Sequence, residues 1–492
     1  MSNLQFQNTT GAVRVTIGKI QTAENIRISV KNDIAEVLSV GVDSTVNSYE
    51  ATEGEVTMFG KTAIKFLYND GAAIAASTYN ADFSANLTNP QISAGTELCF
   101  DVVTVDTKVE TNANTATLAV LLEITAYAYI TDSTPCLVGG EDIFVKTENL
   151  EVLESAEIFN LTAVIDEQLT STKTISTVLL AESCLCISDY TVADDVLRVS
   201  GEATVRLTYL SEGSIVTDTL PFRFERELDA SEILQQAQLK ITPVVRGTKV
   251  RLDIAEDSVN TDFTVEIVAN LCVESCVVGV VEVVTDCYGP SCDFEFGRKT
   301  LQTTLPCGSV VAKKTVDCTL PLENGKTVLT AVNVGAQVTK CTSLEKCAQV
   351  EGIIFATVLT EAEGGTESTR LELPFIQSVD IDYLAPQCQS FATANVASFN
   401  MQDTAGLTAT AELCIAVDSC RTVSYSVITE ATEKPFDKTQ LPAIEVCLAH
   451  KGETLWELAK GLHMSEEDLL AVNPEITSPL QKDARIVVYN KI

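Results

Sequence analysis

The sequence predicts a mainly β protein, with three tandem antiparallel β-sandwich or half-barrel domains followed by a small strand–helix–helix–strand domain. Most of the 492 residues belong to runs rich in Val, Thr, Ile and Ala, in which apolar and polar positions alternate. A period of two is typical of antiparallel strands that are buried on one face. One succession of such runs occurs three times, and only the segment around residues 451–474 has a helical period.

Each repeat begins with an opening strand and continues with a central strand that contains a glycine. The opening strands are IAEVLSV (34–40), ISTVLLA (175–181) and KTVLTAV (326–332). The central glycines Gly60, Gly201 and Gly352 are 141 and 151 residues apart, which is the size of a domain and predicts tandem domains rather than a solenoid. A glycine inside a strand indicates a β-bulge or a close approach of neighbouring backbone.

A strand built on phenylalanine follows 21 to 23 residues after each central glycine, and two long alternating strands close the repeat. The three phenylalanines are Phe83, Phe222 and Phe375. The expected domains cover residues 1–155, 156–306 and 307–432, with a polar linker at 433–443 and a C-terminal domain at 444–492.

The C-terminal segment KGETLWELAKGLHMSEEDLLAVNP (451–474) predicts two short helices. Thr454 and Glu457 fit the T-x-x-E capping box that begins a helix. Ser465 is followed by three acidic residues, which favours the start of a second helix, and an Asn-Pro pair ends it. The flanking strands are expected at residues 443–449 and 485–490.

The composition disfavours several classes of partner. With 33 basic and 68 acidic residues, the chain has a formal net charge of −35, which repels nucleic acid and anionic lipid. No apolar run is long enough to span a bilayer, so no membrane insertion is expected. The first residues lack the features of a secretory signal, which predicts synthesis and initial retention in a cytosol.

The sequence predicts no enzyme, no cofactor and no metal site. It contains no nucleophile-elbow, P-loop, zincin or Rossmann pattern, and the only two histidines, His450 and His463, lie in the tail, where a surface role is expected for both. A carboxylate-based glycosidase stays open as an alternative. The 16 cysteines have irregular spacings without a C-x-x-C pair, so they are reduced core residues or cross-links, within or between chains, formed under oxidising conditions, and an iron–sulfur site is a third alternative.

These motifs resemble two known domain families. The repeat is similar to the SPOCS domain of clostridial and bacillar spore-coat proteins, most clearly in VLRVSGEATVRLTYL (196–210) and LPFRFEREL (220–228). The tail resembles a LysM module, with GETLWELA (452–459) at its start and LLAVNP (469–474) at its close. Tandem SPOCS-type β domains followed by a LysM domain are similar to the architecture of SipL-like spore-coat morphogenetic proteins.

The resemblance implies a structural and interaction protein of the bacterial spore envelope, made in the mother-cell cytoplasm and later present in the spore coat at the spore surface. Its LysM domain would dock the coat-scaffolding ATPase of stage IV sporulation or other coat proteins. Exposed sheet edges of the β domains would support a homo-oligomer. The alternative is a surface or filament-forming structural protein that binds peptidoglycan or another GlcNAc-containing glycan.

The resemblance also implies a shallow groove between two loops of the LysM domain, which would bind either a glycan or a protein. One side would consist of Gly452, Glu453, Thr454 and Leu455, and the other of Asn473, Pro474 and Ile476. Trp456 lies beside the apolar stripe of its helix, so it either packs inside the protein or presents an aromatic ring to the ligand.

Overall fold

A computed structural model describes residues 3–252, 261–321, 327–362, 365–382, 384–403, 407–436 and 442–489. Their regular structure is almost entirely antiparallel β, with two short helices near the C-terminal end, which confirms the mainly β prediction. Apolar side chains recur at every second position of these strands, so one face of each strand can be buried while the other remains polar.

The first eighteen strands form three sets of six, which we call the first, second and third sets. The first set comprises β1 (Leu4–Ser29), β2 (Glu36–Thr52), β3 (Glu55–Asn69), β4 (Ile74–Thr88), β5 (Leu98–Asn112) and β6 (Thr115–Gly140). The second comprises β7 (Phe144–Thr170), β8 (Thr177–Ala193), β9 (Val196–Ser211), β10 (Ser214–Asp229), β11 (Gln238–Leu252) and β12 (Asp262–Tyr288). The third comprises β13 (Cys292–Thr319), β14 (Thr327–Ser343), β15 (Cys347–Ala362), β16 (Gly365–Asp380), β17 (Gln389–Asp403) and β18 (Leu407–Pro435).

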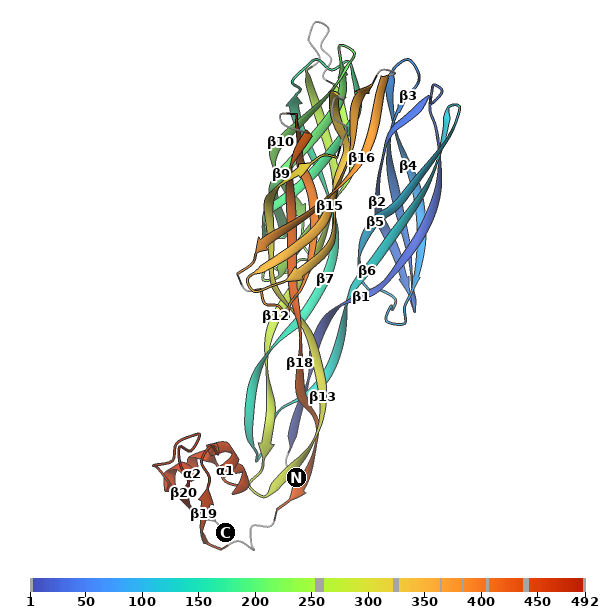
Figure 1. Ribbon diagram of the computed structural model, residues 1–492. Helices are drawn as coiled ribbons and strands as arrows, with labels where there is room; N and C mark the ends of the chain where they lie inside the picture. Colours follow the sequence, from blue (N-terminus) through green and yellow to red (C-terminus); the bar gives the residue numbers. More distant parts are fainter. Residues whose placement is uncertain are drawn as a thin grey trace.

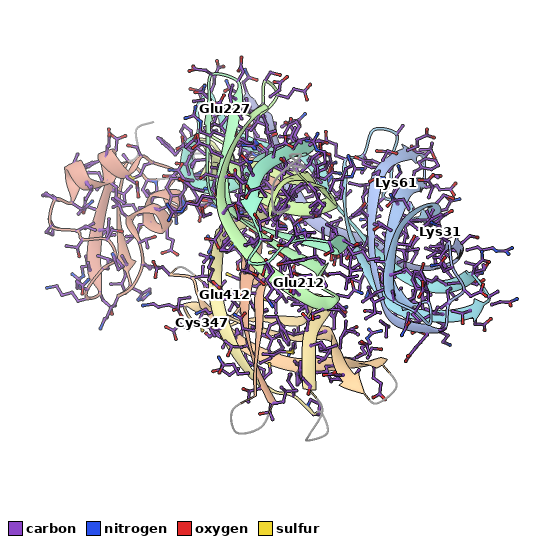
Figure 2. All side chains as sticks on the ribbon, turned by 90° about the horizontal axis from the view of Figure 1, so that it is seen from above. Lys31, Lys61, Glu212, Glu227, Cys347 and Glu412 are labelled. Carbon is purple, nitrogen blue, oxygen red and sulfur yellow. A yellow bond between two sulfur atoms is a disulfide. The ribbon has the colours of Figure 1, made fainter. Side chains whose placement is uncertain are left out.

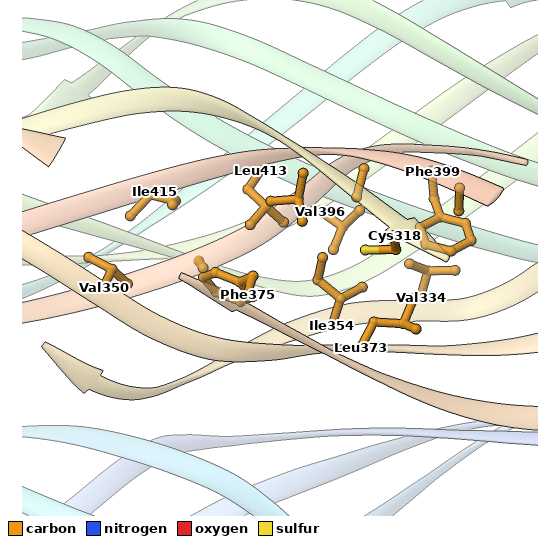
Figure 3. Close-up of a cluster of buried hydrophobic side chains, with 14 of the residues drawn as sticks. Cys318, Val334, Val350, Ile354, Leu373, Phe375, Val396, Phe399, Leu413 and Ile415 are labelled. Carbon is orange, nitrogen blue, oxygen red and sulfur yellow. The ribbon is translucent and has the colours of Figure 1, made fainter. Parts of the chain in front are cut away.

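Every set has the same topology. Its second, third and fourth strands form one three-stranded sheet, and its first, sixth and fifth strands form another, with the sixth in the centre. A hydrophobic core lies between the two sheets of each set. In the third set, Phe375 and Leu373 of β16 meet Leu413 and Ile415 of β18 in this core (Figure 3).

The central glycines lie beside β-bulges, as their position in the strands predicts. Gly60 pairs with Val46 and Gly352 pairs with Val338, and in both partner strands the register shifts immediately after the paired residue. Phe83 pairs with Gly60 and Phe375 with Gly352, and a Cβ atom on either glycine would overlap the phenylalanine ring. A ring above a strand glycine covers backbone that would otherwise lack a side chain.

In the second set, the phenylalanine that faces the central glycine is not Phe222, the residue that the sequence pattern aligns with Phe83 and Phe375. There Gly201 pairs with Phe224, whereas Phe222 pairs with Ala203. The spacing between glycine and phenylalanine therefore identified the correct strand but not the residue that faces the glycine, because LPFRFEREL offers two phenylalanines on the same face.

A second bulge in each opening strand joins the three sets to one another. Leu38, Leu179 and Leu329 are left out of the strand pairing at equivalent positions of β2, β8 and β14. All three contact one apolar cluster, which also contains Leu67 of the first set and Leu359 of the third. Seen from above, the three sets lie around a common centre (Figure 2).

Below the sheets, three two-stranded ribbons continue as a narrow stalk (Figure 1). The ribbons are residues 4–14 with 129–140, 144–155 with 277–288, and 292–305 with 421–435. The stalk has its own core, formed by Cys136, Leu150, Val152, Val283, Leu301 and Val427. The boundaries predicted at 155/156 and 306/307 lie within β7 and β13, where each strand passes from the stalk into its sheet.

Replacing Gly60 with alanine is expected to destabilise the protein by about 1–3 kcal/mol, because the new Cβ overlaps the Phe83 ring and the Thr45 carbonyl oxygen. Denaturant unfolding measures the change. Gly139→Ala is the matched control, since the space around Gly139 is open. Equal unfolding midpoints for the two variants would contradict the close approach at Gly60.

Candidate docking module and its junctions

The C-terminal module consists of β19 (Ile444–Ala449), α1 (Leu455–Gly461), α2 (Glu466–Val472) and β20 (Ala484–Tyr489), with the two strands paired antiparallel. The predicted helix starts are confirmed. The Thr454 hydroxyl accepts a hydrogen bond from the Glu457 amide, and the Glu457 carboxylate accepts one from the Thr454 amide. Ser465 caps α2 by accepting from the amide of Asp468. These caps satisfy amides that no helical carbonyl can reach.

The structure brings together the two loops that the resemblance assigns to a groove. The Gly452 amide donates to the Leu480 carbonyl oxygen at 2.9 Å, and the Leu480 amide donates to the Glu453 carbonyl oxygen at 2.9 Å. The Leu455 amide donates to the Ser478 hydroxyl at 3.0 Å. Gly452 and Pro474 are exposed, whereas Glu453, Thr454 and Leu455 are half-buried. Much of the backbone hydrogen-bonding capacity of these loops is therefore used between them.

Asn473 and Ile476 face the interior of the module. The Asn473 amide nitrogen donates to the carbonyl oxygens of Leu469 and Val487, at 3.0 and 2.8 Å, and its oxygen accepts from the Val487 amide at 2.8 Å. Ile476 belongs to the hydrophobic core of the module. Asn473 thus joins the end of α2 to β20, and this role accounts for its amide side chain.

Trp456 packs against the end of the stalk. Its ring lies edge-on to the Tyr288 ring with 5.0 Å between the centroids, and its Nε1 donates to Asp286 Oδ2 at 2.8 Å. Lys460 Nζ donates to the other oxygen of Asp286 at 2.5 Å, and the Tyr288 hydroxyl donates to the Met464 carbonyl oxygen at 2.8 Å. A single carboxylate of β12 therefore accepts from two residues of α1 and holds the module on the stalk.

The surface role expected for His463 is wrong, whereas His450 is exposed. His463 is buried and its ring stacks on that of Phe436 at a centroid distance of 3.9 Å. Its Nδ1 lies 3.1 Å from the Gly289 carbonyl oxygen, in the turn between β12 and β13. The sequence could not show this, because the contacting residues are far away in the chain.

One face of the two-stranded sheet remains exposed and is mainly apolar, with the exposed Arg485 beside Leu448 at one end. Ile444, Val446 and Leu448 of β19 point outward, and Tyr489 of β20 pairs with Ile444 on the same face. We call these four side chains the apolar strip. Because α1 and α2 bury the opposite face, including Ile486 and Val488, the strip is unpartnered within the described chain.

A second polar junction lies between the three sets. Glu274 of β12 accepts from Arg14 of β1 at 3.0 Å, from Lys240 of β11 at 2.5 Å and from the Tyr129 hydroxyl of β6 at 2.9 Å. Lys240 also lies 3.3 Å from Asp418 of β18. The cluster thus draws on all three sets, and its two cations offset its two carboxylates.

Electrostatics at this junction favour an ionised Glu274. Burial by itself raises the pKa of Glu274, but the positive charges of Lys240 and Arg14 outweigh it and lower the pKa to about 2. Burial raises the pKa of Asp418, the negative charge of Glu274 raises it further, and Lys240 and Arg14 oppose this rise. Sequence reasoning did not single out these residues, because a chain with 68 acidic residues produces many acid–base pairs by chance.

The cysteines include one disulfide, which joins Cys186 of β8 to Cys414 of β18 and thereby connects the second and third sets. The other fourteen are all buried or half-buried. The chain therefore contains both a cross-link between cysteines and cysteines that are buried in the protein as thiols.

Replacing Asp286 with alanine is expected to loosen the module from the stalk, since the Trp456 N–H and the Lys460 ammonium lose their shared acceptor. Trp456 is the only tryptophan, so its fluorescence reports on this junction alone. The emission maximum should move to longer wavelength and quenching by acrylamide should increase. Asp317→Ala, in the third set, should change neither property, and an unchanged spectrum in Asp286→Ala would refute the assigned contact.

Replacing Glu274 with glutamine should lower the free energy of unfolding by about 3 kcal/mol, because two buried cations lose their anionic partner. Glu266→Gln removes an exposed partner of Lys249 and should have a much smaller effect. Urea unfolding of both variants provides the comparison. Similar losses in the two would show that the buried junction contributes little.

The contribution of Glu274 should also depend on pH. Its pKa is about 2 in the folded protein and 4.5 ordinarily, so the unfolded chain binds the proton more readily. The stabilisation is therefore complete above about pH 4.5 and is lost as the pH falls toward 2. Asp418 has a raised pKa in the folded protein, so its own contribution to stability increases as the pH falls. The stability difference between wild type and Glu274→Gln should shrink across this window, and a constant difference would contradict the assignment.

Among the described residues, no helix is long and apolar enough to cross a membrane, and no three His, Cys, Asp or Glu side chains are placed to hold a metal ion. Comparisons of this chain with models of known protein families, with curated proteins and with solved structures find no match. Proposals about its function therefore depend on the sequence motifs and on the geometry described above.

Proposed function

We propose that the protein is a non-enzymatic structural and interaction protein of the bacterial spore envelope, and that its C-terminal module is a LysM domain that docks a coat scaffold protein. The repeat and tail motifs carry the resemblance to SipL-like coat proteins. In this proposal the three strand sets are three SPOCS-type domains, and the protein passes from the mother-cell cytoplasm to the spore coat.

The single observation that most favours docking of a protein is the apolar strip. Ile444, Val446 and Leu448 are each about 60% exposed, on a sheet face that has no cover in the described chain. Aliphatic side chains offer no hydrogen bonds to sugar hydroxyls, but contiguous exposed apolar surface is typical of protein interfaces. The internal use of the Asn473 amide also disfavours a glycan at the loops.

The position of the module suits a docking role. It is attached at the end of the stalk farthest from the three sets (Figure 1), by contacts of α1 and of the segment after it with β12. The strip lies on the opposite side of the module core from the helices. The attachment and the proposed binding surface thus use different faces, and a partner can bind without displacing the stalk.

The test uses Val446→Glu in the full chain and the purified coat-scaffolding ATPase of stage IV sporulation. A charge at the centre of an interface should cost about 2 kcal/mol or more, which is roughly a 30-fold loss of affinity. Ile376→Glu is the matched control, since Ile376 is also an exposed strand residue, at 64% against 60% for Val446. Unchanged Trp456 fluorescence would show that the module is still folded and attached.

Sedimentation with purified peptidoglycan provides the other arm of the test. Wild-type protein that pellets with peptidoglycan and ignores the ATPase would overturn the docking proposal in favour of the glycan alternative. Localisation of a tagged chain during sporulation tests the assignment to the spore envelope. A protein that never concentrates around the forespore would contradict it.

A further inference from the structure

Two thiols face each other across the boundary between the first and second sets. Cys99 of β5 and Cys272 of β12 have their Sγ atoms 3.0 Å apart, although 173 residues separate them in the chain. Both side chains are half-buried and neither belongs to the Cys186–Cys414 disulfide. Two sulfur atoms at this distance are closer than ordinary non-bonded contact permits, so little movement is needed to join them.

The place of this pair in the topology complements the existing disulfide. Cys186–Cys414 connects the second set to the third, and Cys99 and Cys272 lie between the first set and the second. We propose that Cys99 and Cys272 are a disulfide-forming site, and that oxidation by a small-molecule disulfide joins all three sets covalently. This inference is independent of the proposed function.

The pair lies close to the ionic junction. Cys272 is two residues from Glu274 on β12, and Cys99 pairs with Tyr127, whose ring contacts the Arg14 guanidinium. A hydrogen bond from Cys272 lowers the pKa of Cys99 despite its burial, with a smaller contribution in the same direction from Lys240 and Arg14, while Glu274 opposes it. A thiolate at Cys99, which this hydrogen bond stabilises, can begin the exchange.

The chemistry balances without a metal or an enzyme. The Cys99 thiolate attacks one sulfur of oxidised glutathione, which forms a mixed disulfide and releases one glutathione thiolate. The Cys272 thiolate then attacks Sγ of Cys99, forming the Cys99–Cys272 bond and releasing the second glutathione thiolate. The two cysteine protons pass to the two released thiolates, so two thiols are oxidised and one disulfide is reduced.

Formation of the Cys99–Cys272 disulfide would change how the first set is attached to the second. In the thiol form, the backbone between β6 and β7 and non-covalent contacts such as Arg14 with Glu274 attach the first set to the other sets. With both disulfides present, cross-links between β5 and β12 and between β8 and β18 hold the sheets of neighbouring sets together even when the non-covalent contacts are lost. The oxidised chain should then resist separation of the sets under denaturing conditions that release them in the thiol form.

The experiment treats the folded full chain with oxidised glutathione and maps its disulfides by mass spectrometry after cleavage at glutamate. Cleavage yields peptide 98–110 with Cys99 as its only cysteine and peptide 267–274 with Cys272 as its only cysteine. We expect these two peptides to be linked, and the link to be absent from Cys99→Ser and Cys272→Ala. Cys341→Ser removes another half-buried thiol and should leave the link intact.

The existing disulfide serves as the internal standard, because it links peptides 183–202 and 413–430. Recovery of that link without the Cys99–Cys272 link would overturn the proposal. Mixing isotopically labelled and unlabelled chains before oxidation distinguishes a bond within one chain from a bond between chains, and a link found only between chains would also overturn it. Oxidation should raise the urea midpoint of wild type but not of Cys272→Ala.

Discussion

The arrangement of the three strand sets depends on one residue in each opening strand that is left out of the pairing. A strand with period two can bury only one face, and here that face already covers the core of its own set. A bulge leaves Leu38, Leu179 and Leu329 out of the strand pairing, so their side chains do not follow the regular alternation between the two faces. Their shared cluster gives the three sets a common apolar centre.

The stalk core adds a second apolar contact among the sets, whereas the other contacts between their sheets include polar and covalent ones. Once the apolar faces are buried inside each set, the faces that meet one another carry Arg14, Lys240, Glu274 and Asp418. Buried charges of this kind are tolerated because they neutralise one another and are hydrogen-bonded. Polar junctions of matched charge fix orientation more than they add stability, and the Cys186–Cys414 bond then holds that orientation.

The C-terminal module shows how a feature of the sequence can have two roles. The stripe that contains Leu458 and Ala459 forms the module core, as its helical spacing predicts. Trp456 lies beside that stripe and is used for the contact with Asp286 and Tyr288, so the aromatic ring binds the chain itself. This contact directs the helices toward the stalk and leaves the β19 face as the outward surface of the module.

The sequence by itself determined the local structure: the mainly β class, the central glycines at bulges, and the caps at Thr454 and Ser465. These features depend on periodicity and on hydrogen bonds between near neighbours, which a single chain segment records. Only the tertiary structure decided that Asn473 and His463 are internal, that Glu274 joins three sets, and that Cys99 meets Cys272. These contacts join residues that are far apart in the chain or depend on which face a segment presents, and both follow from how the sheets and the stalk pack rather than from any local pattern.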